Sequence, residues 1–421
     1  MCEYDRMMRL NMEKIEPKIN IAKNLSRLRK KQGITQEALA EKLYVSNKTI
    51  SKWERGAGFP EITQLLKISR FFGISVDELL REERGGIAFA GNILVDNVKM
   101  IGVYPTKGML SQISSVSTAV GGCVPNTAID LAVIDRNLPI SAYGRVGNDE
   151  SGKYVTFEMQ KNGIDVSGVK ISNEEATSFS DVMTVTGTGE RTFFHHVGAN
   201  AAFSPDDIDL AYLNCKMMHV GYILLLDMFD QPDPEYGTVM ARFLKSVQEL
   251  GIRTSFDVVS DSSGRFAEKV LPALKYTDNA IMNEIECCGT SGLPARDENG
   301  KLIVENIRKS MELMMSYGVG ERVIVHCPEA GFILNRNGEF SKSPSIKIEK
   351  GHIKGSVGAG DAFCAGCLYG IYHDFADVDI LDFASAAAVC NLTAYDSVSG
   401  MRDKEYIFNL IATAGHEDIA L

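Results

Sequence analysis

The deciding stretch of this sequence is Gly355-Ser356-Val357-Gly358-Ala359-Gly360-Asp361-Ala362-Phe363. A β-type run at residues 345–350 leads into it, and the apolar segment 362–372, rich in Ala and Gly, continues with helical character. The glycines at 358 and 360 leave backbone N–H groups uncovered, and the helix start behind them adds a partial positive charge. This turn is therefore predicted to bind an anion, most naturally a phosphoryl group during its transfer.

Asp361 stands at the head of the predicted helix, beside the place where the anion would lie. A carboxylate there suits a general base that accepts a proton from an attacking hydroxyl. The alternative is a purely structural turn in which Asp361 is an ordinary N-cap. These nine residues alone leave both interpretations open.

The composition is that of a soluble globular protein, with 421 residues, 45% hydrophobic and 24% charged, and the length suits two domains. No apolar run approaches the length of a membrane-spanning helix, so we expect no membrane association. Residues 1–18 do not resemble a signal peptide and are predicted to be a mobile leader. The nine cysteines have no repeating spacing, and we expect reduced thiols in a cytoplasmic protein.

The charge is unevenly distributed along the chain. Residues 1–84 hold 17 Lys and Arg against 12 Asp and Glu, whereas the remainder holds 27 against 43. A basic module therefore precedes an acidic one, which indicates a polyanionic partner for the front module only.

Residues 19–82 are predicted to form a helical bundle, because apolar side chains recur there at helical spacing. Its segments Thr35-Gln36-Glu37-Ala38-Leu39-Ala40 and 45–56 resemble the Cro/XRE-type helix-turn-helix over the full length of that module. The resemblance implies that the helix from Ser46 to Glu54 enters the major groove of double-stranded DNA and that paired half-sites bind a homodimer. The candidate DNA-binding residues are Gln36, Asn47, Lys48, Ser51, Lys52 and Arg55. The alternative is a helical protein-interaction module that reuses the same scaffold.

A short polar stretch at residues 82–86 marks a boundary, and residues 86–421 are predicted to form an α/β domain. Residues 87–96 are predicted to be one buried strand that ends in an aspartate. Residues 99–120 and 179–194 alternate in the manner of strands. Further buried strands then alternate with helices, which indicates a parallel, layered sheet.

Two other motifs in this domain carry groups suited to binding. Gly121 and Gly122 let a ligand approach the backbone, and Asn126, one turn into the following helix, offers a donor and an acceptor. The tetrapeptide Asn283-Glu284-Ile285-Glu286 follows a predicted strand, and a carboxylate there could hold Mg²⁺, largely through water. Its alternative meaning is an exposed acidic helix start.

In this order, the motifs resemble those of the PfkB (ribokinase-like) carbohydrate and nucleoside kinases. The resemblance implies a three-layer αβα sandwich with a mostly parallel sheet and a small β lid from about residues 99–120 and 177–198. It implies ATP-dependent phosphorylation of a sugar or sugar-like alcohol with Mg²⁺. Asp361 would be the base and residues 358–360 the anion hole. The substrate-binding residues would be Asp96, Gly121, Gly122 and Asn126. The cofactor-binding residues would be Asn283, Glu286, Gly331, Ser356 and Gly358, and Glu286 would hold Mg²⁺ through water.

The sequence departs from the family pattern at two places. His326-Cys327-Pro328 stands where relatives usually have Thr-x-Gly, and Gly355-Ser356 replaces the usual Asp-Thr. These changes keep a second hypothesis open, a DNA-binding repressor whose kinase-like domain senses a sugar or phosphosugar without turnover. The sequence also leaves open which acceptor is used and whether a monovalent cation takes part.

Overall fold

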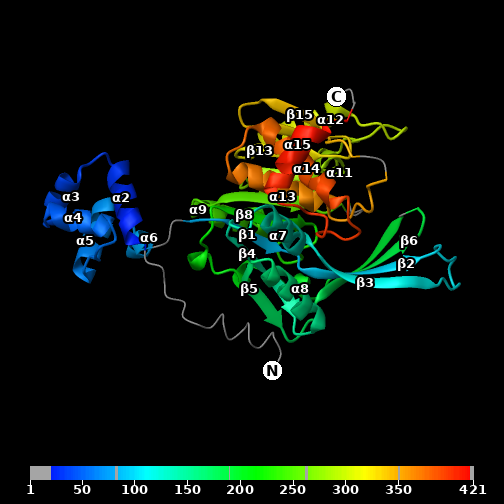
Figure 1. The fold of residues 1–421 in the computed structure, drawn as a ribbon, viewed down its shortest axis with the longest axis horizontal. Coiled ribbons are helices and arrows are strands. Elements are labelled where there is room, and N and C mark those ends of the chain that lie inside the picture. The colour runs from blue at the N-terminus through cyan, green and yellow to red at the C-terminus, as the bar shows by residue number, and fades with distance from the viewer. Residues whose placement is uncertain (1–19, 81–83, 189, 261–263, 349–350, 418–421) are drawn as a thin grey trace. The chain divides into compact units, whose positions relative to one another are not determined.

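A computed structural model of the chain describes residues 20–80, 84–188, 190–260, 264–348 and 351–417. The chain divides into two compact units, Met1–Gly85 and Gly86–Leu421, and each is described by itself (Figure 1). The leader predicted for residues 1–18 lies outside the described residues.

The first unit is helical over its described residues, which confirms the predicted all-α bundle. Thr35 and Ser46 cap two of its helices by accepting backbone N–H bonds from Ala38 and Thr49. Leu25, Leu39, Ile50, Trp53 and Ile68 are among the side chains that form its buried core. The helices are α2 (Ile21–Lys31), α3 (Gln36–Leu43), α4 (Asn47–Glu54), α5 (Ile62–Phe72) and α6 (Val76–Leu80).

Nine of the described strands in the second unit form one sheet, in the order β15-β14-β13-β12-β11-β8-β1-β4-β5. The strands from β13 to β5 pair in parallel, and only β14 and β15, at one edge, are antiparallel. Their bounds in that order are Phe340–Pro344, Ala330–Asn335, Arg322–His326, Asn279–Asn283, Arg253–Val258, Met217–Ile223, Ile87–Gly91, Ile140–Gly147 and Asp165–Ser172.

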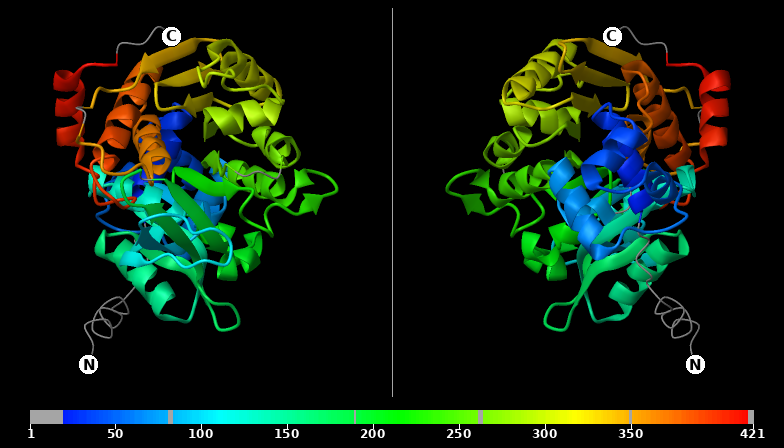
Figure 2. Two further views of the ribbon diagram at one scale, coloured as in Figure 1. Left: turned by 90° about the vertical axis from the view of Figure 1, so that its right-hand side faces the viewer. Right: turned by 90° about the vertical axis from the view of Figure 1, so that its left-hand side faces the viewer.

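Helices cover both faces of this sheet, as Figures 1 and 2 show. Strand β1 shows why: Ile87 and Phe89 pack into the core on one face, and Ala88 and Ala90 pack into the core on the other. The first core takes in α7 (Cys123–Ile134), α8 (Glu150–Lys161), α13 (Ala359–Tyr372), α14 (Asp377–Asn391) and α15 (Lys404–Ala414). The second takes in α9 (Val239–Glu249), α10 (Phe266–Leu274), α11 (Glu284–Ser291) and α12 (Val304–Ser316). The predicted three-layer αβα architecture is confirmed.

A second sheet of four strands projects from this body and corresponds to the predicted lid (Figure 1). Its order is β3-β2-β6-β7, with β2 and β6 parallel and the outer pairs antiparallel. The bounds are β3 (Ile113–Gly121), β2 (Leu94–Ile101), β6 (Ser178–Val185) and β7 (Arg191–His196). We refer to these four strands as the lid. Smaller elements are β9 (Pro232–Asp233), β10 (Gly237–Thr238) and the 3-10 turns Gly198–Ala202, Pro205–Asp207 and Leu210–Tyr212.

Two strand predictions were wrong in their bounds. Residues 87–96 are not one strand: β1 ends at Gly91, whose φ of +146° breaks the extended path, and Asp96 lies inside lid strand β2. The run at 345–350 is not a strand over its described residues, because β15 ends at Pro344 and Ile346 makes only an isolated bridge to His416. No helix among the described residues is long and apolar enough to cross a membrane.

Candidate active site

The glycine-rich turn lies at the start of α13. Gly358 is the N-cap, with φ +75°, and a Cβ there would lie 2.6 Å from the backbone oxygen of Ser397, so only glycine fits. The helix begins at Ala359 and its first turn directs backbone N–H groups out of the helix end. The Asp361 side chain is buried. Among the described residues it accepts no backbone N–H bond that would make it the N-cap of α13.

Two side chains from distant elements hold the Asp361 carboxylate. The hydroxyl of Tyr222, near the end of β8, donates to Oδ1 at 2.7 Å, and the amide of Asn126 on α7 donates to Oδ2 at 2.9 Å. The hydroxyl of Ser397 in turn donates to the amide oxygen of Asn126 at 2.8 Å. Asn126, predicted to bind substrate, therefore orients Asp361 in this structure. Tyr222 was not predicted.

Burial and charge set the pKa of Asp361 close to neutrality. Loss of solvent is the largest effect, and together with the negative charge of Asp257 it raises the pKa to about 7 against the opposing hydrogen bonds from Tyr222 and Asn126. A base whose pKa lies near working pH is both ionised and able to hold a proton. The environment therefore suits acid–base chemistry at this carboxyl.

A cavity of about 210 Å³ opens beside Asp361. Three carboxyl groups line it, from Asp257 near the end of β11, Glu286 on α11 and Asp361 on α13, together with Gly358 and Gly360 of the turn. The strands β8, β11 and β12 are parallel, so their carboxyl ends bring Tyr222, Asp257 and Asn283 to one edge of the sheet. This edge is where ligands bind in open parallel sheets.

Asn283 and Glu286 form a capping box at the start of α11. The Asn283 side chain accepts the N–H bonds of Ile285 and Glu286, and Glu286 Oε2 accepts the N–H of Asn283 at 2.9 Å. The other oxygen, Oε1, accepts from Ser260 at 2.7 Å and from the Asn283 amide at 2.8 Å. Glu286 is buried, so the exposed acidic helix start does not describe it, and burial raises its pKa to about 8.

The cavity fits a hard divalent cation. Asp257 Oδ1 is buried and accepts no hydrogen bond from the described residues, and His219 Nε2 lies 3.6 Å from it. The charge of Asp257 also raises the pKa values of both Glu286 and Asp361, so the Asp257 carboxylate repels the other two carboxyl groups. Oxygen ligands with uncompensated negative charge are what Mg²⁺ binds, directly or through water. Asp257, which was not predicted, joins Glu286 as a candidate ligand.

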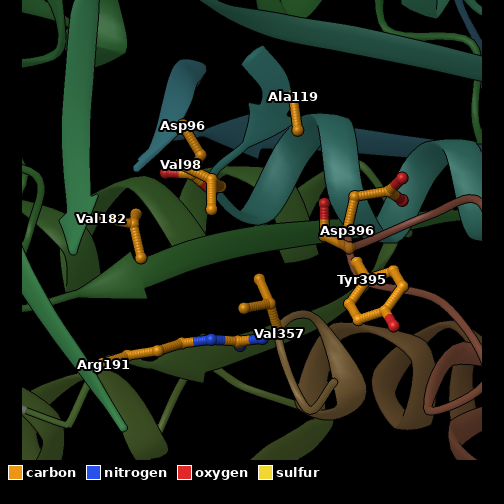
Figure 3. Close-up of a pocket in the computed structure, with 9 residues that line it drawn as sticks. Asp96, Val98, Ala119, Val182, Arg191, Val357, Tyr395 and Asp396 are labelled. Atoms are coloured by element: carbon orange, nitrogen blue, oxygen red, sulfur yellow. The ribbon is translucent and has the colours of Figure 1, made fainter. Parts of the chain in front are cut away.

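A second pocket lies between the lid and the main body (Figure 3). Asp96, Val98, Ala119, Val182 and Arg191 line it from the lid, and Val357, Tyr395, Asp396 and Ser397 line it from the body. Its volume of about 10 Å³ holds roughly one water molecule, so in this structure it has no room for a larger ligand. We refer to it as the lid pocket.

Asp96 faces this pocket, and burial raises its pKa to about 7 against the favourable charge of Arg191. A Cβ at Gly121 would lie 2.6 Å from Asp96 Oδ2, so the glycine makes room for that carboxylate. Gly122 follows as the N-cap of α7. Asp96, Gly121 and Gly122, which were predicted to bind substrate, thus lie close together, and Arg191, which was not predicted, lines the lid pocket with Asp96.

The other predicted nucleotide-binding residues lie outside the 210 Å³ cavity. Gly331 is buried within β14, where a Cβ would lie 2.8 Å from Leu381, and Ser356 is exposed before the turn. His326, at one of the departures from the family pattern, does line the cavity. Its ring packs on Phe363 at 4.9 Å, and burial lowers its pKa to about 4, which keeps the ring neutral.

In the first unit, α4 exposes Lys48 and Lys52, while Ile50 and Trp53 are buried. Two further candidates have partners inside the unit: Gln36 donates to Glu54 at 2.8 Å, and Asn47 donates to Glu37. Glu54 also receives two bonds from Arg29, at 2.6 and 2.9 Å, which ties α2 to α4. Arg55 donates back to the Ser51 carbonyl. Of the six predicted residues, Asn47, Lys48, Lys52 and Arg55 are exposed and Ser51 is partly buried.

Comparison with known proteins adds to this geometry. The model of the pfkB family carbohydrate kinases matches residues 91–404, and a helix-turn-helix family model matches residues 25–79. The HTH-type transcriptional activator BcrR of Enterococcus faecalis is 52% identical over 59 residues, which span 14% of this chain and 29% of that protein.

Two relatives cover most of the second unit. The 5-dehydro-2-deoxygluconokinase of Clostridium beijerinckii is 26% identical over 314 residues, covering 72% of this chain and 86% of that protein. The structure of Arabidopsis thaliana ribokinase in complex with ribose and ATP aligns over 78% of this chain and 99% of that chain, with a TM-score of 0.63 and 20% identity. The second comparison establishes likeness of fold.

Proposed function

The chain belongs to the pfkB family of carbohydrate kinases, and we propose that it transfers the γ-phosphoryl group of ATP to a hydroxyl of a sugar or sugar-like alcohol. One observation carries the proposal. Asp361 is a buried carboxylate with a pKa of about 7, oriented through both oxygens and placed at the N-terminal turn of a helix that can bind a phosphoryl group.

In this proposal Asp361 takes the proton of the acceptor hydroxyl. The hydroxyl oxygen forms a bond to the γ-phosphorus while the bond from that phosphorus to the β-phosphate oxygen breaks, which releases ADP. Tyr222 and Asn126 fix the direction of the carboxylate. The N–H groups at the start of α13 stabilise the charge on the transferred group.

Mg²⁺, when bound, neutralises phosphate charge and helps to align the transferred group. Glu286 and Asp257 are the residues that would hold it, directly or through water, and Asn283 fixes the position of Glu286. The lid closes over the acceptor and excludes water, which would otherwise compete as a nucleophile.

Turnover is tested by incubating purified protein with Mg·ATP and a panel of hexoses, pentoses, ketoses, sugar acids and nucleosides while ADP release is followed. The proposal predicts release that depends on one class of acceptor and is lost in Asp361→Asn. Release that is independent of acceptor, or unchanged in the variant, would contradict it.

The helix-turn-helix domain supports a second activity, sequence-specific binding of double-stranded DNA by a homodimer. The exposed Lys48 and Lys52 on α4 support it, because lysines on the recognition helix can contact base edges and phosphates. The protein would then control transcription in response to its sugar. We expect the protein to retain one particular DNA sequence from a random pool at 150 mM salt. Equal binding of all sequences would argue against sequence-specific recognition.

A sugar-sensing repressor without turnover is the second candidate, and His326 is the observation that favours it. Its ring lines the cavity and lies 3.3 Å from where a Cβ on Gly360 would stand, so it restricts space beside the anion turn. Asp361→Asn separates the two functions. If ADP release is lost while the effect of sugar on DNA binding remains, catalysis and sensing are both real; if the wild type also lacks turnover, the sensor is the better account.

A further inference from the structure

A group of buried side chains that can bind metal lies on the face of the main sheet that α7 and α13 cover. The ligand atoms Cys123 Sγ, His219 Nε2 and one carboxylate oxygen of Asp257 all lie within 4.8 Å of one another, and all three residues are buried. They are the one such group of three among the residues that the structure describes. Cys364 adds a second sulfur, whose Sγ lies 3.6 Å from His219 Nε2. We refer to these residues as the thiol cluster.

The alternation of side chains along two paired strands brings the cluster together. His219 of β8 lies opposite Ser255 of β11, and Asp257 follows two residues later on the same strand. The residues between them pack into the core on the other face of the sheet, so these three side chains point toward α7 and α13. Cys123 begins α7, and Cys364 lies in the second turn of α13.

The spacing of the ligand atoms suits tetrahedral coordination. Bonds of about 2.0–2.3 Å to Zn²⁺ at tetrahedral angles place neighbouring ligand atoms about 3.3–3.8 Å apart. His219 Nε2 lies 3.6 Å from Asp257 Oδ1 and 3.6 Å from Cys364 Sγ. A Cβ on Gly221 would lie 1.7 Å from Asp257 Oδ1 and 2.7 Å from Cys123 Sγ, so the glycine leaves the space in which carboxylate and thiol meet.

His219 is held in the orientation of a metal ligand. Ser255 Oγ lies 2.9 Å from Nδ1, so the hydroxyl can accept the Nδ1–H and leave the Nε2 lone pair for an ion. Asp257 Oδ1 accepts no hydrogen bond from the described residues, and 3.6 Å is too long for a hydrogen bond from Nε2. A cation between the two atoms would compensate both buried groups.

We propose that the thiol cluster binds one soft divalent cation, with Zn²⁺ as the expected ion, through Cys123, His219 and Asp257. Cys364 supplies the fourth position. Sulfur and imidazole ligands select Zn²⁺ against Mg²⁺. Burial raises the pKa of the Cys123 thiol, so each Zn–S bond that forms releases a thiol proton to solvent. Asp257 and Cys364 also line the 210 Å³ cavity, which gives the ion a path into the cluster.

Binding at this site would inhibit the proposed kinase, and this part of the inference rests on that function. Asp257 is also a candidate ligand of Mg²⁺ in the cavity. Zn²⁺ bound to Asp257 withdraws that carboxylate from the Mg²⁺ site. Zn²⁺ should therefore slow phosphoryl transfer while Mg·ATP is in excess.

Binding is tested with Co²⁺, whose visible spectrum reports tetrahedral coordination and whose ultraviolet band reports bonding to thiolate. We expect the full chain, freed of metal with a chelator, to bind one Co²⁺ with both signatures and to exchange it for Zn²⁺. Loss of a group that only orients a ligand costs about 10- to 100-fold in metal affinity, so Ser255→Ala should weaken Zn²⁺ binding by about tenfold and Cys123→Ser by at least about 100-fold.

The matched control is Cys390→Ser, which changes a buried thiol on α14 outside the cluster and should bind Zn²⁺ as the wild type does. Equal melting temperatures of the metal-free proteins show that the variants are folded. A wild-type spectrum without the thiolate band would refute the site. So would the same band in Cys123→Ser, or affinities that are equal in the wild type, Ser255→Ala and Cys123→Ser.

Inhibition is measured as the Zn²⁺ concentration that halves ADP release at a fixed excess of Mg·ATP. The wild type and Cys390→Ser should share one value, and Cys123→Ser should require at least about 100-fold more Zn²⁺. If Zn²⁺ binds but equally inhibits all three proteins, its inhibitory role is refuted. If no acceptor is turned over but Co²⁺ binds with the thiolate band, the kinase proposal fails and the metal site stands. If acceptors are phosphorylated but neither ion binds, the kinase stands and the inference is refuted.

Discussion

Replacing Tyr222 by Phe tests whether the hydrogen bonds around Asp361 control its proton affinity. The substitution removes one donor, at 2.7 Å from Oδ1, and little else. A hydrogen bond to a charged group contributes about 1.5–3 kcal/mol, and one pKa unit corresponds to about 1.4 kcal/mol. Its loss should therefore raise the pKa of Asp361 from about 7 to about 8–9.

The consequence is a pH-dependent loss of activity. Since the base must be ionised to accept a proton, kcat/KM of the wild type should rise with pH through a midpoint near 7. In Tyr222→Phe at pH 7 the ionised fraction falls from about one half to between about one tenth and one hundredth, so kcat/KM falls about 5- to 50-fold. Near pH 10 the two proteins should agree within about a factor of two.

The assay is kcat/KM from ADP release between pH 5.5 and 10, with Tyr236→Phe as the control. Tyr236 lies between β9 and β10 and lines neither site cavity, so its removal should leave the profile unchanged. A midpoint that stays near 7 in Tyr222→Phe, or a loss of the same size at every pH, would refute the reasoning.

Three further predictions concern the metal, the DNA and the assembly. Glu286→Gln preserves the capping box but removes a charge. It should raise the Mg²⁺ concentration for half-maximal activity by about tenfold or more, with an unchanged melting temperature. An unchanged Mg²⁺ titration would exclude Glu286 from the metal site. Lys52→Ala should weaken operator binding and reduce the slope of log K against log salt concentration by roughly one. The control variant Lys67→Ala, on α5, should change neither quantity. Equal slopes for the wild type and Lys52→Ala would show that Lys52 does not contact DNA. Light scattering should give twice the chain mass of 46.1 kDa, and a monomeric mass at working concentration would refute the homodimer.

The local sequence was sufficient to predict a structural feature where one segment of the chain forms that feature by itself. The glycines at 358 and 360 and the following apolar run predicted the turn and α13, because backbone freedom and helix start are local properties. The starts of α3 and α4 are local features of the same kind, because the side chains of Thr35 and Ser46 cap them. The αβα layering followed from alternating strands and helices together with the family resemblance.

The side chains that converge on Asp361 could not be predicted in the same way. Tyr222 lies 139 residues away along the chain and belongs to no motif, so only the pairing of β1 with β8 brings it to the site. Asn126 was predicted as a substrate contact, but its amide is shared by Asp361 and Ser397, from segments that meet only in the fold. Arg191 was not predicted, because its direction into the lid pocket depends on the register of β7 against β6.

The break between β1 and β2 has a related explanation. Residues 87–96 have the apolar character of one buried strand, but the chain passes from the main sheet to the lid at Asn92, whose side chain bonds Tyr222 N and the Leu225 carbonyl. These contacts involve residues more than a hundred positions away. Sequence periodicity indicates which residues of a segment are buried, but it does not indicate which of two sheets the segment joins.

The most direct measurement of the central claim is transfer of label from [γ-³²P]ATP to the acceptor, with wild type and Asp361→Asn compared at pH 8. Asp361 as base predicts labelled acceptor with the wild type and a rate at least about 100-fold lower with the variant, since general-base catalysis contributes 10²–10⁴-fold. Labelled product formed at equal rates by both proteins would contradict the role assigned to Asp361. No labelled product from the wild type with any acceptor, despite sugar binding, would contradict catalysis itself.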